Sequence, residues 1–178
     1  MIVGVGARPG EIGLWAEKPT GNYLAIDPIG FGALARNFPD GQLLTSVVGE
    51  KPGRLPFFLN TSSGGNAFQE GSPRTEINIR VQVLDEIVNT PFPDWEIAVL
   101  NIEAEALQPE VLRGASQTLA RPKIVTVDAG EERYGQSTAL QRLGRLFSLG
   151  FQLQFVSSGG STSTSLNKDI EFLLPSGT

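Results

Sequence analysis

The sequence predicts an α/β fold, in which a mostly parallel sheet of about seven strands has an antiparallel last strand and helices on both faces. Three observations support this prediction. Short apolar runs alternate along the chain with stretches of helical periodicity. Some of these runs are apolar at most positions, which is typical of strands that are buried on both faces. The chain ends in two strand-like segments joined by a Ser/Gly/Thr connection, which favours an antiparallel pair at the edge of the sheet.

The first half of the chain predicts a β-α-β unit that is extended by further strands. Its expected elements are a strand at 2–6, a helix at 10–18, a strand at 23–27, a helix at 31–38, and strands at 42–49, 54–60 and 77–83. An acid and a proline end the second strand, and Gly49 closes the third. The last two strands alternate in polarity on either side of a polar loop that is rich in serine and glycine.

The second half continues the alternation. Its expected elements are a helical turn at 84–88, a strand at 95–105, a helix at 109–120, a strand at 123–130, a helix at 136–150, and strands at 151–157 and 169–175. The strand at 95–105 is the best candidate for the centre of the sheet, because most of it is apolar. Pro109 suits a first helical position. Leu140, Leu143, Leu146 and Phe147 share one face of the helix at 136–150.

Composition limits the classes of function. The 178 residues are 40% hydrophobic, which suffices for one substantial core, so we expect a single domain over 1–178. A net charge of -5 argues against nucleic acid as a partner, and no apolar run has the roughly 20 residues that a membrane span needs. No export signal is visible, so a cytoplasmic protein is expected. The absence of cysteine and histidine excludes Cys/His zinc sites and Ser-His-Asp triads.

Four carboxylates follow apolar strands. They are Asp27, Glu103, Glu105 and Asp128. Because the carboxyl ends of parallel strands meet at one edge of a sheet, these acids are expected to converge where such sheets bind ligands. For any single acid, a role as a helix cap or a solvated loop residue is an equal alternative.

Four segments resemble, in order and spacing, the motifs of the FkbM family of S-adenosylmethionine-dependent methyltransferases. VGVGARPG at 3–10 resembles the first cofactor motif, V-D-x-G-A-N-x-G, and YLAIDP at 23–28 resembles the second-strand motif. VQVLDEIV at 81–88 is similar to the "tLDdl" segment, and LNIEAEALQPEVLRGA at 100–115 is similar to the signature K-I-D-x-E-G-x-E-x-x-x-L-x-G-A. The resemblance extends nearly to the end of the chain. It implies a Rossmann-like methyltransferase domain with S-adenosylmethionine as cofactor.

The resemblance implies cofactor-binding roles for eight positions: Gly4, Gly6, Ala7, Arg8, Gly10, Asp27, Val47 and Val48. The small residues of the first motif let the backbone pass close beneath the methionine part of the cofactor. Asp27 would accept hydrogen bonds from the ribose hydroxyls, and Val47 and Val48 would lie near the adenine. A plain tight turn explains the glycines as well, and a buried strand explains the valines.

The signature segment supplies the candidate catalytic residues. Glu103 and Glu105 match its two acids, and the resemblance implies that this rim faces the transferred methyl group. They are therefore candidates for orienting or deprotonating an acceptor hydroxyl. Asn101 and Ala106 depart from the pattern, since the family has lysine and glycine there.

The first motif departs from the family at two positions. Gly4 stands where the family has aspartate, which weakens recognition of the cofactor's charged amino group. Arg8 stands where the family has asparagine, and its charge is unfavourable near a sulfonium unless it pairs with the cofactor carboxylate. The chain also carries nothing ahead of its first strand, where related enzymes have a cap over the cofactor, so we expect a domain without this cap.

Two functions of different classes follow. The first is a methyltransferase that acts on an oxygen of a carbohydrate or other small metabolite. The second is a catalytically inactive methyltransferase-like fold that serves as a binding or assembly module. No metal site is expected, and a homo-oligomer is compatible with the sequence.

Overall fold

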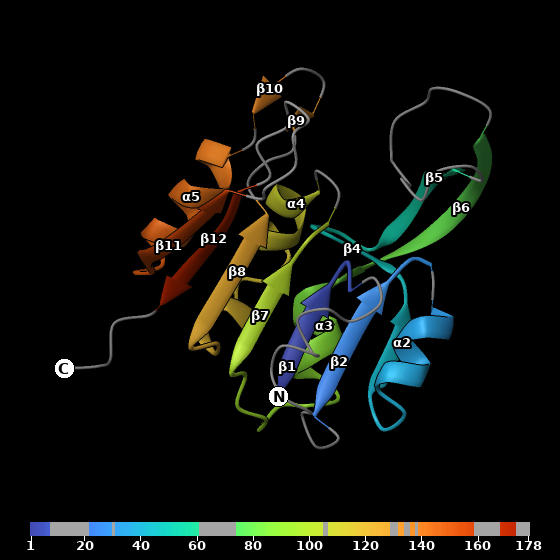
Figure 1. Ribbon diagram of the computed structural model, residues 1–178, viewed down its shortest axis with the longest axis horizontal. Helices are drawn as coiled ribbons and strands as arrows, with labels where there is room; N and C mark the ends of the chain where they lie inside the picture. Colours follow the sequence, from blue (N-terminus) through green and yellow to red (C-terminus); the bar gives the residue numbers. More distant parts are fainter. Residues whose placement is uncertain are drawn as a thin grey trace.

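The computed structural model confirms the predicted α/β class with a mostly parallel sheet (Figure 1). The residues that it describes are 1–7, 22–29, 31–60, 74–104, 107–128, 132–133, 136–137, 139–158 and 168–173. The predicted helix at 10–18 lies outside these residues, as does most of the predicted polar loop after residue 60. None of the helices in the described part of the chain has the length and apolar character needed to cross a membrane.

The large sheet has seven strands in the order β11-β12-β8-β7-β1-β2-β3. Their bounds are β1 Ile2–Val5, β2 Tyr23–Asp27, β3 Gln42–Thr45, β7 Val99–Ile102, β8 Ile124–Asp128, β11 Gln152–Ser158 and β12 Lys168–Leu173. The five strands from β3 to β8 pair in parallel, and β12 is antiparallel to both β8 and β11. The opening strand β1 therefore lies inside the sheet, with parallel neighbours on both sides.

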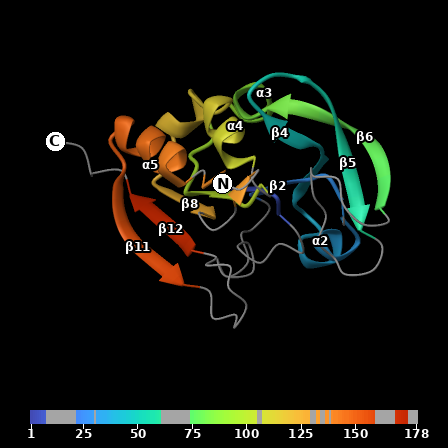
Figure 2. The same cartoon turned by 90° about the horizontal axis from the view of Figure 1, so that it is seen from above.

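Helices cover both faces of this sheet (Figure 2). Their bounds are α2 Phe31–Asn37, α3 Leu84–Asn89, α4 Gln108–Arg113 and α5 Ala139–Ser148. Side chains alternate along each strand, so Val3 and Leu24 join one core with α3, α4 and α5, while Ile2 and Tyr23 join another with α2. Burial on both faces explains why these strands have little polar content.

The predicted strand at 42–49 is wrong as a single strand, because it divides at Ser46. β3 stays in the large sheet, whereas β4 (Val47–Gly49) pairs in parallel with β6 (Arg74–Val83) in a second sheet. The buried Ser46 hydroxyl donates to the carbonyl oxygens of Val47 and Arg80, at 3.0 and 3.1 Å. β5 (Gly53–Asn60) completes this sheet as the antiparallel partner of β6.

Three other elements are shorter than predicted. The strand expected at 95–105 is β7, which begins only at Val99. The helix expected at 109–120 ends as α4 at Arg113 and is followed by a 3-10 turn, η1, at Thr118–Ala120. The segment expected as one helix at 136–150 contains β10 (Gln136–Ser137), which pairs with β9 (Glu132–Arg133), and then α5.

Candidate functional site

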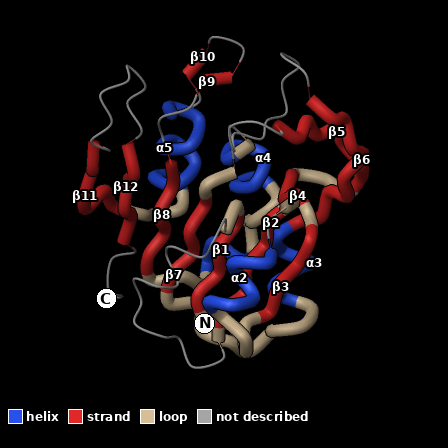
Figure 3. Tube along the Cα trace, turned by 45° about the vertical axis from the view of Figure 1, so that its right-hand side comes forward, coloured by secondary structure: helices blue, strands red, loops and turns tan. Residues whose placement is uncertain are grey.

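The strand order marks one edge of the large sheet as the candidate site. Successive strands add outward from β1 through β2 to β3, and the chain then returns to the other side of β1 with β7 and β8. Ligands of such doubly wound sheets bind beyond the carboxyl ends of the strands, where the order reverses. Gly6 follows β1, Asp27 ends β2 and Glu103 follows β7, so all three residues lie at this edge. Figure 3 shows β7, β1 and β2 as neighbouring strands.

The backbone of Val5 and Gly6 joins the ends of three strands. Its N–H donates to the Ile26 carbonyl oxygen at 2.8 Å, and the Glu103 N–H donates to the Val5 carbonyl oxygen at 2.8 Å. Gly6 has a φ of +74°, and a Cβ at this position would overlap the Glu103 carbonyl oxygen. Only glycine therefore fits, because both the backbone conformation and the space exclude a side chain.

Asp27 is buried and forms part of its own turn. Its residue is 7% exposed, and its Oδ1 accepts a hydrogen bond from the Ile29 N–H at 2.7 Å across Pro28. This contact explains the acid-proline pair that ends the strand. The hydrogen bond from Ile29 gives Asp27 a structural role in addition to the binding role that the sequence predicts.

Gly4 lies beneath the hydroxyl of Tyr23. A Cβ on Gly4 would come within 2.8 Å of this oxygen, so an aspartate here and Tyr23 in its present position exclude each other. The Tyr23 ring packs against Phe38 at a tilt of 52° with centroids 4.5 Å apart, and Tyr23 is 1% exposed. Its hydroxyl occupies the space into which a side chain at position 4 would extend.

The Tyr23 hydroxyl is buried and has no hydrogen-bond partner in the part of the chain that the structure describes. Burial raises the pKa of Tyr23 far above its usual value, and the negative charges of Glu103 and Asp27 raise it further. The hydroxyl is therefore neutral at physiological pH and faces the electrostatic field of both carboxylates.

Glu103 is half-buried and is positioned by a polar chain that crosses two strands. The Asn101 Nδ2 donates to the Glu103 Oε1 at 3.4 Å, and the Thr126 Oγ1 donates to the Asn101 Oδ1 at 2.5 Å. The neighbour of this carboxylate is therefore a neutral amide. The chain Thr126–Asn101 links the end of β7 to β8.

Of the remaining predicted site residues, Ala7 is buried and its N–H donates to the Ile26 carbonyl oxygen at 3.3 Å. Val47 and Val48 lie in hydrophobic cores that Ala104, the neighbour of Glu103, packs against. The two valines are 4% and 2% exposed, and Val47 packs with residues of β5 and β6. Arg8, Gly10 and Glu105 lie outside the described residues, and so does Ala106. The side chain of Asp128 also belongs to the part that is not described.

Two buried polar residues are not predicted from the sequence as part of the site. The sequence predicts Tyr23 only as a strand residue, and Tyr23 opens β2 at its amino end, from which its hydroxyl reaches Gly4. Gln108, the first residue of α4, is fully buried, and neither amide atom has a partner among the described residues. No sequence signal distinguishes Gln108 from a solvated helix start.

The segments VQVLDEIV at 81–88 and EVLRGA at 110–115 contact each other. The Asp85 N–H donates to the Gly114 carbonyl oxygen at 3.1 Å, and the Asp85 carboxylate accepts from the Gln117 N–H, the Thr118 N–H and the Thr118 hydroxyl. A Cβ on Gly114 would overlap the Gly49 carbonyl oxygen, so glycine allows α4 to lie against the end of β4. These contacts are architectural.

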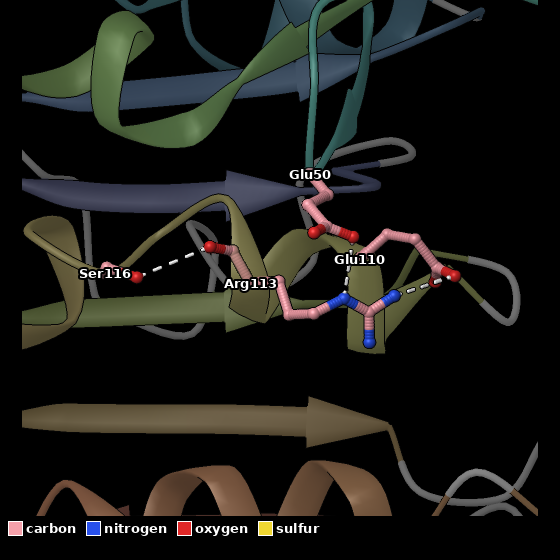
Figure 4. Close-up of polar contacts among 4 residues, drawn as sticks. All are labelled: Glu50, Glu110, Arg113 and Ser116. Carbon is pink, nitrogen blue, oxygen red and sulfur yellow. Dashed lines mark hydrogen bonds and ion pairs between the residues drawn. The ribbon is translucent and has the colours of Figure 1, made fainter.

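An ion-pair group ties the same region together (Figure 4). Arg113 Nε lies 2.8 Å from Glu50 Oε2, and its Nη2 lies 3.1 Å from Glu110 Oε1. The Arg113 carbonyl oxygen accepts from the Ser116 hydroxyl at 3.4 Å. Because the Arg113 side chain is 43% exposed, these pairs stabilise the fold only modestly.

The chain is similar in structure to a TehB-like SAM-dependent methyltransferase from Corynebacterium glutamicum. The two share 11% sequence identity with a TM-score of 0.49, and the match covers 97% of this chain and 79% of the other. No family model and no curated protein matches the sequence. The resemblance to the FkbM family therefore stays a prediction.

Proposed function

We propose that the protein binds S-adenosylmethionine at the carboxyl ends of β1, β2 and β7 and transfers its methyl group to a hydroxyl oxygen of a carbohydrate or other small metabolite. One observation carries the proposal: Gly6, Asp27 and Glu103 converge where the strand order reverses. This is the place where doubly wound sheets bind nucleotide-like ligands.

The residues at this edge fit such a cofactor. The Asp27 carboxylate lies at this edge, and a carboxylate offers acceptor oxygens to both hydroxyls of a ribose. Gly6 lets the ends of β1 and β7 approach each other closely, because a Cβ at this position would overlap the Glu103 carbonyl oxygen. This close approach brings the first residue after β7, Glu103, next to the turn after β1.

Methyl transfer requires little acid-base catalysis by the protein. S-adenosylmethionine, when bound, supplies an already reactive methyl group. The protein must hold the acceptor oxygen in line with this group and accept the proton that the hydroxyl loses. Glu103, whose carboxylate is oriented by Asn101, and Glu105 are the candidates for this role.

Calorimetric titration with S-adenosylmethionine and S-adenosylhomocysteine tests the proposal. We expect the wild type to bind both, and Asp27→Ala to bind at least tenfold more weakly, because a hydrogen bond to a charged group contributes about 1.5–3 kcal/mol. Asp27→Asn keeps an oxygen for the Ile29 N–H, so a loss of affinity in this variant reports ligand contact rather than the turn. Asp40→Asn, the same change at an exposed acid, is the control and should bind like the wild type.

A non-catalytic module is the second candidate. The observation that favours it is the burial of Asp27, Val47 and Val48, each of which has a packing or turn role that needs no ligand. Wild-type protein that binds neither compound would support this candidate and contradict the first. Binding without release of S-adenosylhomocysteine in the presence of sugars and hydroxylated metabolites would indicate a module that has kept the ligand and lost the transfer.

A further inference from the structure

Tyr23 is the buried polar group that the architecture leaves unexplained. Its ring fills the layer between the sheet and α2, where phenylalanine would pack equally well, yet its hydroxyl has no partner in the described structure. A buried hydroxyl without a hydrogen bond costs about 1–3 kcal/mol relative to one that is paired. A hydroxyl retained under these conditions points to a partner outside the described residues.

The charged groups near the Tyr23 hydroxyl indicate which charge its partner carries. The carboxylates of Glu103 and Asp27 are close enough to raise the pKa of Tyr23, and the hydroxyl oxygen lies within 2.8 Å of the place that a Cβ on Gly4 would take. The negative potential at this position favours a cation and opposes a carboxylate. A neutral phenol oxygen can accept a hydrogen bond from an ammonium group.

We propose that the Tyr23 hydroxyl accepts a hydrogen bond from the α-ammonium group of the cofactor's methionine part, in the place of the acid that Gly4 lacks. This inference rests on the proposed function. The hydroxyl lost its hydration during folding, so a donor that reaches it gains a hydrogen bond without further desolvation of the oxygen. Tyr23 is thereby a specificity residue for the amino-acid end of the ligand.

Tyr23→Phe, titrated with three compounds, tests the inference. S-adenosylhomocysteine carries both the ammonium and the carboxylate, decarboxylated S-adenosylmethionine carries only the ammonium, and 5′-methylthioadenosine carries neither. Tyr23→Phe should bind the first two about tenfold or more weakly than the wild type does, because a hydrogen bond to a charged group is lost. Its affinity for 5′-methylthioadenosine should not change. The melting temperature should stay or rise, since the variant removes an unpartnered polar atom.

Each other result overturns the inference in a recognisable way. Unchanged affinity of Tyr23→Phe for S-adenosylhomocysteine means that the hydroxyl is a packing residue. An equal loss for all three compounds means a general disturbance of the site, and a loss confined to S-adenosylhomocysteine means that the hydroxyl contacts the carboxylate. If the wild type itself binds none of the three, the proposed function fails first and the inference fails with it.

Discussion

Two glycines with positive φ, Gly6 at +74° and Gly150 at +88°, differ in what surrounds them. A Cβ on Gly6 would overlap backbone atoms of Glu103, whereas a Cβ on Gly150 would meet nothing within 4 Å. A side chain at Gly150 would cost only the strain of a left-handed backbone, whereas a side chain at Gly6 would also collide with the neighbouring strand. The close approach is what makes Gly6 part of the candidate site.

Substitution by alanine should show this difference. Gly150→Ala should lower the free energy of unfolding by about 1–2 kcal/mol from backbone strain alone. Gly6→Ala should lower it clearly more, because the backbone of β7 must also move. Gly144→Ala, inside α5 with open space around it, should instead raise stability by about 0.5–1 kcal/mol. Urea unfolding of the three variants measures these changes, and equal losses at positions 6 and 150 would contradict the close approach.

The raised pKa of Tyr23 predicts a pH dependence of stability. Below the ordinary tyrosine pKa of about 10, the hydroxyl is neutral in both the folded and the unfolded chain. Above it, the unfolded chain loses the proton while the folded chain keeps it, so stability falls as the pH rises. Between pH 9 and 11 the wild type should lose about 1 kcal/mol more than Tyr23→Phe does. Parallel denaturation curves at both pH values measure the difference, and an identical fall in both proteins would show that Tyr23 is not buried in this way.

At the scale of elements, the contact between α3 and the turn after α4 holds the signature segment in place. Asp85 lies in the first turn of α3, and its carboxylate binds two backbone N–H groups and one hydroxyl at residues 117 and 118. It caps the entry to η1 across about 30 residues of sequence. Its role is comparable to that of a helix N-cap.

Removal of this cap should destabilise the fold without touching the candidate site. Asp85→Ala should lower the free energy of unfolding by about 2 kcal/mol, the upper range for an N-cap. The exposed neighbour provides a matched control, since Glu86→Ala should change stability by less than about 0.5 kcal/mol. Chemical denaturation gives both values. If Asp85→Ala is as stable as the control but no longer binds S-adenosylhomocysteine, the structural role of Asp85 is contradicted.

At the scale of the whole molecule, local patterns predicted the parallel strands and their acids, because apolar runs and terminal carboxylates are visible in the sequence. The division at Ser46 was not predictable, since it depends on pairing with β6, some 35 residues away. The position of Tyr23 over Gly4 likewise depends on the lateral register of β1 and β2, which pairs Ile2 with Tyr23 and Gly4 with Ala25. Contacts set by strand register leave little trace in one sequence.

The central claim is that S-adenosylmethionine binds at the carboxyl ends of β1, β2 and β7, and backbone amide NMR of the wild type titrated with S-adenosylhomocysteine tests it most directly. We predict saturable shifts that are largest at Gly6, Ala7, Ile29 and Glu103, whose amides belong to or adjoin this edge. Small shifts are predicted at Gln152 on β11 and at Arg54 on β5. Absence of saturable shifts, or shifts confined to these remote strands, would contradict the claim.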